Sequence, residues 1–324
     1  MPYSNFPGGF ANGVTIRGVP ITVTNPGKVF WVYNGTALQG GQRGGSDSNK
    51  GTYDSPFSTI DYAVGQCTAN RGDIIFVKPG HAETISSAAI ITLDVAGIAI
   101  VGLGRGSNRP TLTFSTANTA NIPVTAANIT VSNILHKANF LDIASAYTAT
   151  GTNTPTDFVI DNCEFRDGSS ILNFIKCVTG NATANSMDGF TFSNNKVFGL
   201  ATTAASQCCI MASAQDRQTY LDNFAVYPVL NDTAVLVDFG ANNQTDLNMG
   251  RNKVYRPSTS TTGGSLFSGG STASTGYVYD NYSWHLDNSA GLLAPTGTKL
   301  GFQNNYSMIT GAADKSGLIN PAAV

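Results

Sequence analysis

Apolar residues two positions apart recur along this chain in short segments that each end at an asparagine. The clearest segments span residues 129–133, 158–162, 190–194, 219–223 and 277–281. Alternation with a period of two is typical of a β-strand that buries one face. Most of the asparagines follow one another at an interval of 29 residues, as Asn133 and Asn162 do, although one interval is 32 and the last, from Asn281 to Asn304, is 23. The chain is therefore a repeat of short strands.

A second pair of apolar residues follows the asparagine in each copy. Examples are Cys163 and Phe165, Phe224 and Val226, and Tyr282 and Trp284. Two strands then meet at one residue, and asparagine tolerates the left-handed backbone conformation that so sharp a bend needs. A single unit cannot bury its apolar face alone, whereas stacked units can. The repeat predicts an all-β fold, a right-handed parallel β-helix with rungs ~4.8 Å apart.

Two other β-folds are the alternatives to this solenoid. A propeller blade needs ~40–50 residues per repeat, which is longer than the 29 residues found here. The strands of a β-sandwich have no reason to return at a fixed interval. We therefore favour the parallel β-helix over both.

The segment before the repeat predicts a short helix that covers the open end of the β-helix. Ser58 and Asp61 have the spacing of a capping box, and apolar residues with helical spacing follow from Ile60 onward. A covered end cannot pair with the strands of other chains and aggregate. Residues 72–80 and 97–102 then predict two further strands.

Charge is scarce and evenly distributed. Only 12% of the residues are charged, and 18 Lys and Arg stand against 20 Asp and Glu without a basic or acidic run. This balance excludes the electrostatic surface that nucleic acids or anionic membranes require. No apolar run reaches the ~18 residues of a membrane-spanning helix, and the start of the chain lacks the pattern of a signal peptide. We therefore expect the chain to fold in a bacterial or cytosolic setting.

The cysteines and histidines predict neither a metal site nor a cofactor. The five cysteines are an odd number without a Cys-x-x-Cys spacing, which argues against a disulfide framework and against a zinc site. We expect Cys67, Cys163 and Cys177 to be small buried apolar side chains. The three histidines share no spacing that would assemble a catalytic triad or a metal site.

Composition divides the chain into three parts. Residues 1–50 are glycine-rich and contain one clear strand at 29–33, so they predict an arm with a flexible linker. The alternative for this strand is an ordinary extra strand packed on the cap. Residues 51–310 are predicted to form the β-helix, and the small and polar residues 311–324 to close its far end.

The stretch before the repeat resembles a known family. The residues that carry the resemblance are the run 51–61, the motif Gly72-Asp73-x-Ile75-x-Val77 and the motif Pro79-Gly80-His81-x-Glu83. They look like the entry to pectate-lyase-like right-handed β-helices, and most closely like a group of tailed-bacteriophage virion proteins. Residues 10–21 are similar to the N-terminal segment of that group, and the specific part of the match covers roughly residues 10–135.

This resemblance implies a β-helix, commonly a homotrimer, that is displayed on a bacteriophage particle. The expected partners are further copies of the chain and the major capsid protein or another virion protein, with a host surface glycan as an additional candidate. The expected location is the virion, after assembly in the bacterial cytoplasm. We expect the arm to dock to the particle through Phe10, Asn12, Val14, Ile16, Arg17, Val19, Ile21, Phe30 and Trp31.

Some β-helices cleave polysaccharide, and glycoside hydrolysis needs two carboxylates ~5.5 Å or ~6.5–9.5 Å apart. The residues before the repeat asparagines are predicted to form one outward column, in which Asp161 and Asp222 lie two rungs and ~10 Å apart. Glu164, three residues after Asp161, is the other candidate general acid. These three carboxylates are the candidate catalytic residues under the enzyme hypothesis.

A structural role explains the same charges more simply. Asp222, Arg251 and Asp280 on successive rungs would form an acid-base-acid ladder, and Glu164 is expected to pair with Arg166. The Asn-Thr-Asp, Asp-Asp and Gly-His-Gly motifs of polygalacturonases and the arginine-rich pattern of pectate lyases are absent from the sequence. We therefore favour a non-enzymatic virion protein, a trimeric capsid decoration or cement protein anchored by its arm. The alternatives are a tailspike or head spike that binds or cleaves host polysaccharide, and a plain carbohydrate-binding module.

Overall fold

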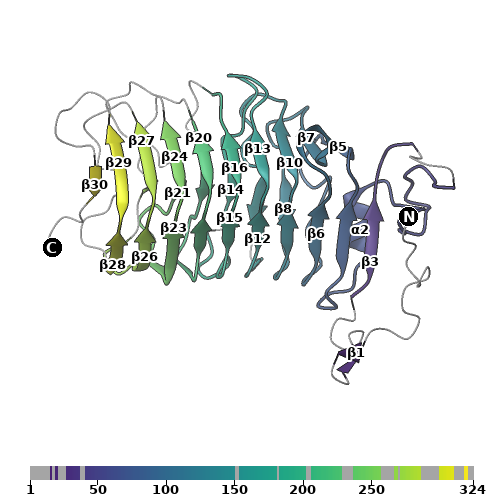
Figure 1. Ribbon diagram of the computed structural model, residues 1–324, viewed down its shortest axis with the longest axis horizontal. Helices are drawn as coiled ribbons and strands as arrows, with labels where there is room; N and C mark the ends of the chain where they lie inside the picture. Colours follow the sequence, from purple (N-terminus) through teal and green to yellow (C-terminus); the bar gives the residue numbers. More distant parts are fainter. Residues whose placement is uncertain are drawn as a thin grey trace.

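A computed structural model shows a parallel β-helix in which the chain winds repeatedly through three sheets (Figure 1). The structure describes residues 15–16, 19–20, 27–36, 41–149, 153–180, 182–201, 206–227, 236–256, 266–268, 271–285, 299–309 and 317–319. Within these residues the sheets hold ten, ten and six strands, and neighbouring strands are parallel except for the last pair of the second sheet. Successive passes therefore stack as coils. The predicted all-β, parallel β-helical fold is confirmed.

The three sheets are named here in the order in which the chain enters them. The first sheet comprises β3 (Val29–Val32), β4 (Ile74–Val77), β6 (Ala99–Gly102), β9 (Thr130–Ser132), β12 (Val159–Asp161), β15 (Thr191–Ser193), β19 (Thr219–Leu221), β23 (Leu247–Gly250), β26 (Thr275–Tyr279) and β28 (Lys299–Gln303). The second comprises β5 (Ala82–Ile85), β7 (Thr111–Phe114), β10 (Leu135–Ala138), β13 (Glu164–Arg166), β16 (Lys196–Phe198), β20 (Phe224–Val226), β24 (Lys253–Arg256), β27 (Tyr282–His285), β29 (Asn305–Ile309) and β30 (Gly317–Ile319). The third comprises β8 (Ile122–Val124), β11 (Tyr147–Ala149), β14 (Lys176–Thr179), β17 (Gln207–Ile210), β21 (Val237–Asp238) and β25 (Phe267–Ser268).

The remaining elements are short. β1 (Thr15–Ile16) pairs with β2 (Val19–Pro20), β18 (Gln215–Asp216) pairs with β22 (Gln244–Thr245), and a single 3-10 turn, η1, spans Gly106–Asn108. β4 and β6 lie within the strands predicted at 72–80 and 97–102. No helix in the described part of the chain is long and apolar enough to cross a membrane.

The predicted end helix is α2 (Ile60–Gly65), which packs its apolar face against β3 and β4. Its N-cap is Thr59, whose side chain accepts a hydrogen bond from the backbone N–H of Tyr62 at 3.3 Å. The predicted cap, Ser58, lies one residue outside the helix, and its backbone N–H donates to Asp47 Oδ1 at 2.9 Å. The helix itself is confirmed, and its start is corrected by one residue.

From β9 onward, one residue with positive φ makes each bend between the first and second sheets. These residues are Asn133, Asn162, Asn194, Asp222, Arg251, Asp280 and Asn304, with φ between 49° and 58°. Asparagine makes the bend at the first three of these positions and at the last, as predicted. In the coils between them an aspartate or an arginine makes the bend, and the repeat asparagine is the next residue. The prediction is wrong for those coils because their asparagines serve another purpose.

The asparagines that directly follow a bend residue form a buried ladder along the inside of the bend. Its members are Asn195, Asn223, Asn252, Asn281 and Asn305, all 0–2% exposed. Each side-chain oxygen accepts a backbone N–H of the preceding coil at 2.8–3.1 Å. Each side-chain nitrogen donates to a backbone carbonyl of the preceding coil at 2.7–3.1 Å. The ladder therefore satisfies the polar groups of the bend and sets the register of neighbouring coils.

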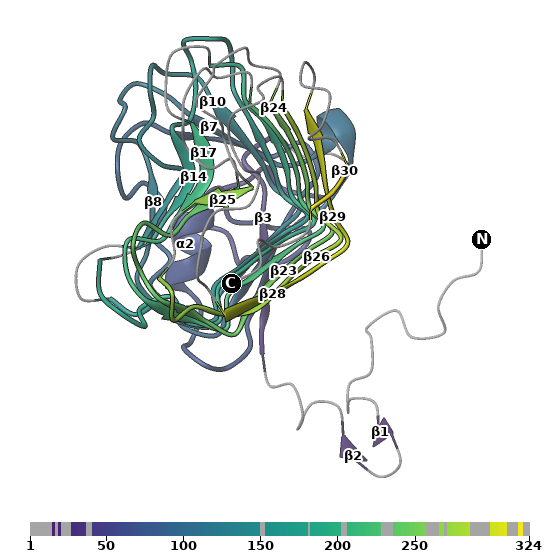
Figure 2. The ribbon, with the colours of Figure 1, turned by 90° about the vertical axis from the view of Figure 1, so that its left-hand side faces the viewer.

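Figure 2 looks along the stack and shows the three sheets around one interior. Apolar side chains fill this interior, with aromatic rings along its length. Phe158, Phe190, Tyr220, Phe239 and Phe267 follow one another with ring centroids 5.9–6.1 Å apart. Such tilted and edge-to-face contacts add to the burial of the rings themselves. The five rings come from four successive coils, with Tyr220 and Phe239 in the same coil, and fill the interior between them.

The cysteines of the described residues are free thiols. Cys163 and Cys177 are buried, as predicted, whereas Cys67 follows α2 and is only half-buried. Cys208 and Cys209 on β17 are also buried.

The second sheet turns its later aromatic residues outward, contrary to the predicted pattern. Phe165 is buried as expected, but Ala225 and Ser283 occupy the equivalent inward positions further along. Phe224 and Tyr282 consequently face outward and are 36% and 51% exposed. Neighbouring residues of a strand point to opposite faces. The residue after an inward-pointing ladder asparagine therefore faces outward.

Strands from outside the range 51–310 lie at both ends of the stack. β3, within residues 1–50, pairs in parallel with β4 and begins the first sheet. Of the two alternatives for this strand, an ordinary strand next to the cap is the one found. β30, within residues 311–324, pairs antiparallel with β29 at the far end.

Candidate functional site

The predicted column of catalytic carboxylates does not form. On the first sheet Asp161 lies opposite Ser193, and Leu221 takes the next position of that column. Asp222 lies in the neighbouring column of bend residues. The one-residue difference between bend and ladder asparagines is the reason for the error. Asp161 and Asp222 therefore do not face each other across one column.

Asp161 and Asp222 are both bonded to residues of the following coil. Asp161 Oδ1 accepts hydrogen bonds from Ser193 Oγ and Asn194 Nδ2, each at 2.8 Å. Asp222 forms a two-point ion pair with Arg251, whose Nε and Nη2 donate at 2.8 and 2.6 Å. The hydrogen bond from Arg251 holds the pKa of Asp222 below its usual value. A general acid must carry a proton, and Arg251 favours the opposite state of Asp222.

The predicted acid-base-acid ladder is formed in part. Besides Asp222, Arg251 donates to Tyr279 Oη at 3.4 Å, and its guanidinium lies 5.8 Å from the centre of that ring. Asp280 takes no part in these bonds among the described residues. The ladder is therefore one ion pair that extends to a tyrosine.

Glu164 lies between two arginines. It forms the predicted ion pair with Arg166 and a second one with Arg109, at 3.4 Å between Oε2 and Nη1. The second pair joins β13 to the segment that precedes β7. The carboxylate is thus engaged in holding coils together.

Two histidines are bonded inside the fold. His81 Nε2 lies 3.1 Å from Glu83 Oε2, and its Nδ1 accepts the backbone N–H of Asn34 at 3.2 Å. His136 is fully buried with its Nε2 2.6 Å from Tyr147 Oη, and burial lowers the pKa of His136 to about 3. Within the described ranges no group of three His, Cys, Asp or Glu side chains could hold a metal ion.

One buried carboxylate escaped the sequence reasoning. Asp167 follows β13, and its two oxygens accept the backbone N–H groups of Phe174 and Leu200 at 2.9 and 2.8 Å. Burial raises the pKa of Asp167 to about 6, although the backbone hydrogen bonds act in the opposite direction. Its surroundings are backbone groups of two loops, so we assign Asp167 to holding those loops. No local motif marks such a residue, because one donor is seven residues away and the other lies in the following coil.

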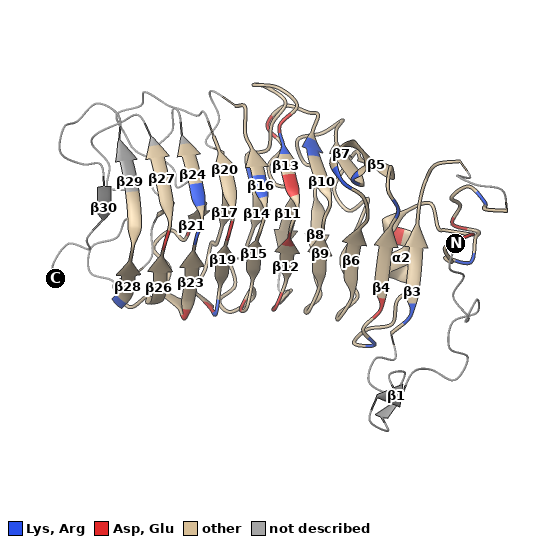
Figure 3. Ribbon diagram, viewed as in Figure 1, with Lys and Arg blue, Asp and Glu red and all other residues tan. Residues whose placement is uncertain are grey.

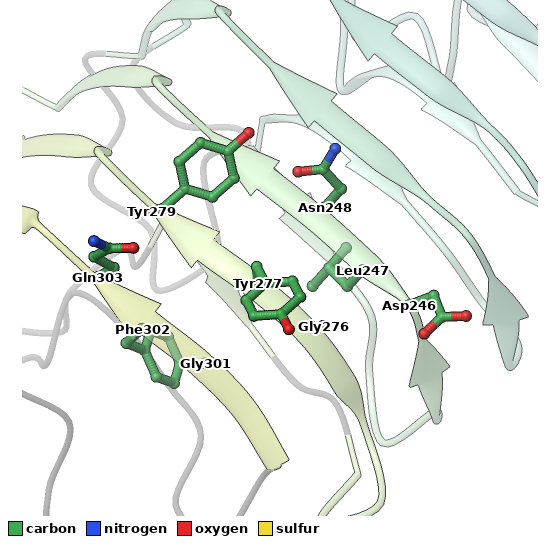
Figure 4. A pocket seen from close by; sticks show the side chains of 9 residues that line it. All are labelled: Asp246, Leu247, Asn248, Gly276, Tyr277, Tyr279, Gly301, Phe302 and Gln303. Atoms are coloured by element: carbon green, nitrogen blue, oxygen red, sulfur yellow. The ribbon is translucent and has the colours of Figure 1, made fainter.

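An open groove of about 750 Å³ lies on the outer face of the first sheet, across β23, β26 and β28 (Figure 4). Two columns of outward residues cross this part of the first sheet, and all of their members except Gly250 line the groove. They are Asn248, Tyr277 and Gly301 in one column and Gly250, Tyr279 and Gln303 in the other. Asp246 lies at one end of the groove.

Glycines let the two tyrosine rings lie against the sheet. A Cβ atom at Gly301 would come within 3.1 Å of the Tyr277 ring, and one at Gly250 would overlap the Tyr279 ring. Tyr277 is 71% exposed, so most of its ring is available to a ligand. The alternation in residues 277–281 predicts Tyr277 and Tyr279 as the apolar pair of that strand. Val278, between them, is the residue that points inward.

A second exposed aromatic surface lies on the outer face of the second sheet. We call it the aromatic face and define it by three pairs of rings. Tyr255 stacks on Trp284 at 3.9 Å, Tyr282 stacks on Tyr306 at 5.3 Å, and Phe198 contacts Phe224 at 5.8 Å. Charged residues are scattered singly along the coils rather than gathered into one patch (Figure 3).

The residues predicted to anchor the arm fall into three groups. Ile16 and Val19 lie in β1 and β2, which pair antiparallel. Phe10, Asn12, Val14, Arg17 and Ile21 lie outside the described residues. Phe30 and Trp31 lie in β3, where they contact other aromatic residues of this chain. Phe30 lies 5.9 Å from Phe57, and Trp31 lies 4.9 Å from Tyr53 and 5.0 Å from Phe76.

Comparison with known proteins finds similarity in structure but not in sequence. No family model matches the chain, and no curated protein matches it. A rhamnogalacturonan lyase has 13% sequence identity and a TM-score of 0.41, over 86% of this chain and 87% of the lyase. A GH136 lacto-N-biosidase from Eubacterium ramulus has 10% identity and a TM-score of 0.26, over 87% of this chain and 68% of the enzyme. Neither likeness assigns an activity to this chain.

Proposed function

We propose that this chain is a non-enzymatic structural protein of a bacteriophage virion, a trimeric decoration or cement protein of the capsid. The observation that carries this proposal is the bonding of Asp161, Glu164 and Asp222, each of which is bonded to a residue of another coil. These carboxylates serve the stack rather than a substrate. The resemblance of residues 10–135 to tailed-phage virion proteins supports the virion as the location.

In this proposal the attachment comes from residues 1–26. The first sheet begins at β3, so these residues precede the β-helix. Phe30 and Trp31 already contact aromatic residues of the same chain. The contact with the major capsid protein or another virion protein is therefore assigned to the earlier group, from Phe10 to Ile21.

The homotrimer of this proposal is supported by the aromatic face. Tyr255, Tyr282 and Tyr306 lie on neighbouring coils and are 39–51% exposed. Single exposed aromatic residues are common on protein surfaces, whereas a group of them marks an interaction surface. Stacked rings on a flat sheet suit an interface, where aromatic residues are enriched and charge is depleted.

A truncation tests the attachment directly. The full chain and a chain that starts at residue 27 are each added to particles that lack the protein, and co-sedimentation is measured. We expect both proteins to have the same circular dichroism spectrum and only the full chain to sediment with particles. Equal sedimentation of the truncated chain would overturn the role of the arm.

The alternative function is a spike that binds or cleaves host polysaccharide. The groove over β23, β26 and β28 favours the binding part of this alternative. Cleavage is tested by the release of reducing ends from host capsule or lipopolysaccharide. We expect no release, whereas release that is lost in Asp161→Asn, Asp222→Asn or Glu164→Gln would contradict the proposed function.

A further inference from the structure

We propose that the groove on the first sheet binds a neutral polysaccharide, with Tyr277 and Tyr279 as the stacking residues, and does not cleave it. This inference goes beyond the structural role proposed above. It rests on the arrangement of the groove and holds whether or not the chain is part of a virion.

Tyr277 and Tyr279 offer two aromatic rings on the outer face of one strand. They stand two residues apart on β26, which separates their Cα atoms by about 6.5 Å. A pyranose ring has an apolar face of C–H groups that packs flat on an aromatic ring, and its hydroxyl groups project around the edge. Two rings on one strand therefore suit successive sugars of a chain that runs along β26. Tyrosine is well suited to this task because it combines a large rigid surface with few rotatable bonds.

The ring of Tyr279 is held in place by contacts within the chain. Its ring lies over Gly250, and Arg251 donates to its hydroxyl group at 3.4 Å. Arg251 is in turn fixed by two hydrogen bonds to Asp222. The ring is thus held before a ligand arrives, and preorganisation lowers the entropic cost of binding.

Polar side chains and one carboxylate surround the tyrosines in the groove. Asn248 and Gln303 border the tyrosines and offer both donors and acceptors to sugar hydroxyl groups (Figure 4). Asp246 is the one charged residue among those that line the groove. A carboxylate at this place disfavours uronic or sialic acids through repulsion between like charges. The groove therefore matches a neutral glycan better than an acidic one.

Saturation-transfer NMR with the full chain tests the proposal. The probes are three neutral hexasaccharides, cellohexaose, maltohexaose and laminarihexaose, and one acidic hexasaccharide, hexagalacturonate. We expect at least one neutral probe to bind, and hexagalacturonate to bind at least about ten-fold more weakly. Tyr277→Ala and Tyr279→Ala should each weaken binding of the neutral probe at least about ten-fold. Tyr277→Phe, which keeps the ring, should stay within about three-fold of the unchanged protein.

Two matched variants separate binding from general effects on the fold. Tyr53→Ala removes a tyrosine that is 50% exposed at the opposite end of the stack, and it should leave binding unchanged. Gly250→Ala should displace the Tyr279 ring and weaken binding, whereas Gly65→Ala adds a methyl group to open space and should not. The proposal is overturned if no neutral hexasaccharide binds, if Tyr53→Ala weakens binding as much as Tyr277→Ala, or if reducing ends are released.

Discussion

Asn252 lies in the middle of the buried ladder, and four hydrogen bonds depend on its side chain. Its Oδ1 accepts from the backbone and side-chain nitrogens of Asn223 at 3.0 and 2.9 Å. Its Nδ2 donates to the backbone oxygen of Tyr220 at 2.8 Å and to Asn281 Oδ1 at 2.9 Å. An alanine would leave these partners buried without water, and each such group costs roughly 1–3 kcal/mol.

We therefore expect Asn252→Ala to lower the free energy of unfolding by about 3 kcal/mol or more. Urea denaturation followed by far-UV circular dichroism measures the change. Asn139→Ala removes an exposed asparagine and should stay within about 0.5 kcal/mol of the unchanged protein. Equal effects of the two substitutions would show that the ladder does not stabilise the coils.

The raised pKa of Asp167 predicts how the stability of the folded chain changes with pH. Burial raises the pKa of Asp167 from its ordinary 3.8 to about 6 in the folded chain. Between these two values the unfolded chain carries the charge while the folded chain keeps the proton. The stability that Asp167 contributes is therefore complete below about pH 4 and is lost as the pH rises through 6. The loss reaches up to about 3 kcal/mol for a difference of this size.

Denaturation at pH 4 and at pH 6.5 tests this expectation. Other groups titrate in the same range, so the quantity to compare is the change between the two pH values in the unchanged protein and in Asp167→Asn. Asparagine cannot ionise, and the variant should lose less stability over this range. The same loss in both proteins would contradict the raised pKa.

At the scale of the strands, the sequence predicted the type of element well and the orientation of the later strands badly. The interval of 29 residues and the period of two were sufficient for a parallel β-helix. They could not distinguish Asn194, which makes a bend, from Asn223, which lies in the ladder. Both are asparagines at the same kind of interval. Their difference is a matter of φ and of partners in the next coil, and neither is local in sequence.

That single residue of offset decided how much of the candidate site could be predicted. The pair of Glu164 with Arg166 and that of Asp222 with Arg251 were predictable, since these charges are close in sequence or one repeat apart. The groove was not predictable. The outward direction of Tyr277 can be inferred only once Val278 is known to face inward. A shift of one residue exchanges the two faces of a strand.

β3 gives a prediction about truncation. Its backbone pairs with β4 along the whole strand, and Trp31 packs between Tyr53 and Phe76. A chain that starts at residue 27 should keep the melting temperature of the full chain. A chain that starts at residue 41 loses β3 and exposes the edge of β4, so it should melt at lower temperature and aggregate. Differential scanning calorimetry with light scattering distinguishes the two, and equal melting would show that β3 adds nothing to the stack.

At the scale of the whole molecule, the aromatic face predicts self-association. Light scattering after size-exclusion chromatography should give three times the chain mass of 33.8 kDa. Tyr282→Glu places a charge on the aromatic face and should shift the protein towards the mass of one chain. Tyr53→Glu, at the other end of the stack, should leave the trimer intact. A single-chain mass for the unchanged protein would contradict the trimer.

The scarcity of charge over the whole chain agrees with an assembled protein. The coils are held by backbone hydrogen bonds, by buried asparagines such as Asn252 and by a few ion pairs, so the surface can be polar without being ionic. Faces that contact other chains are also depleted of charge.

The copy number of the chain in purified virions tests the proposed role most directly. Quantitative mass spectrometry compares peptides of this chain with peptides of the major capsid protein in the same particles. A decoration or cement protein should be present in on the order of hundreds of copies per particle, because it repeats with the symmetry of the capsid. A handful of copies, or none, would contradict that role.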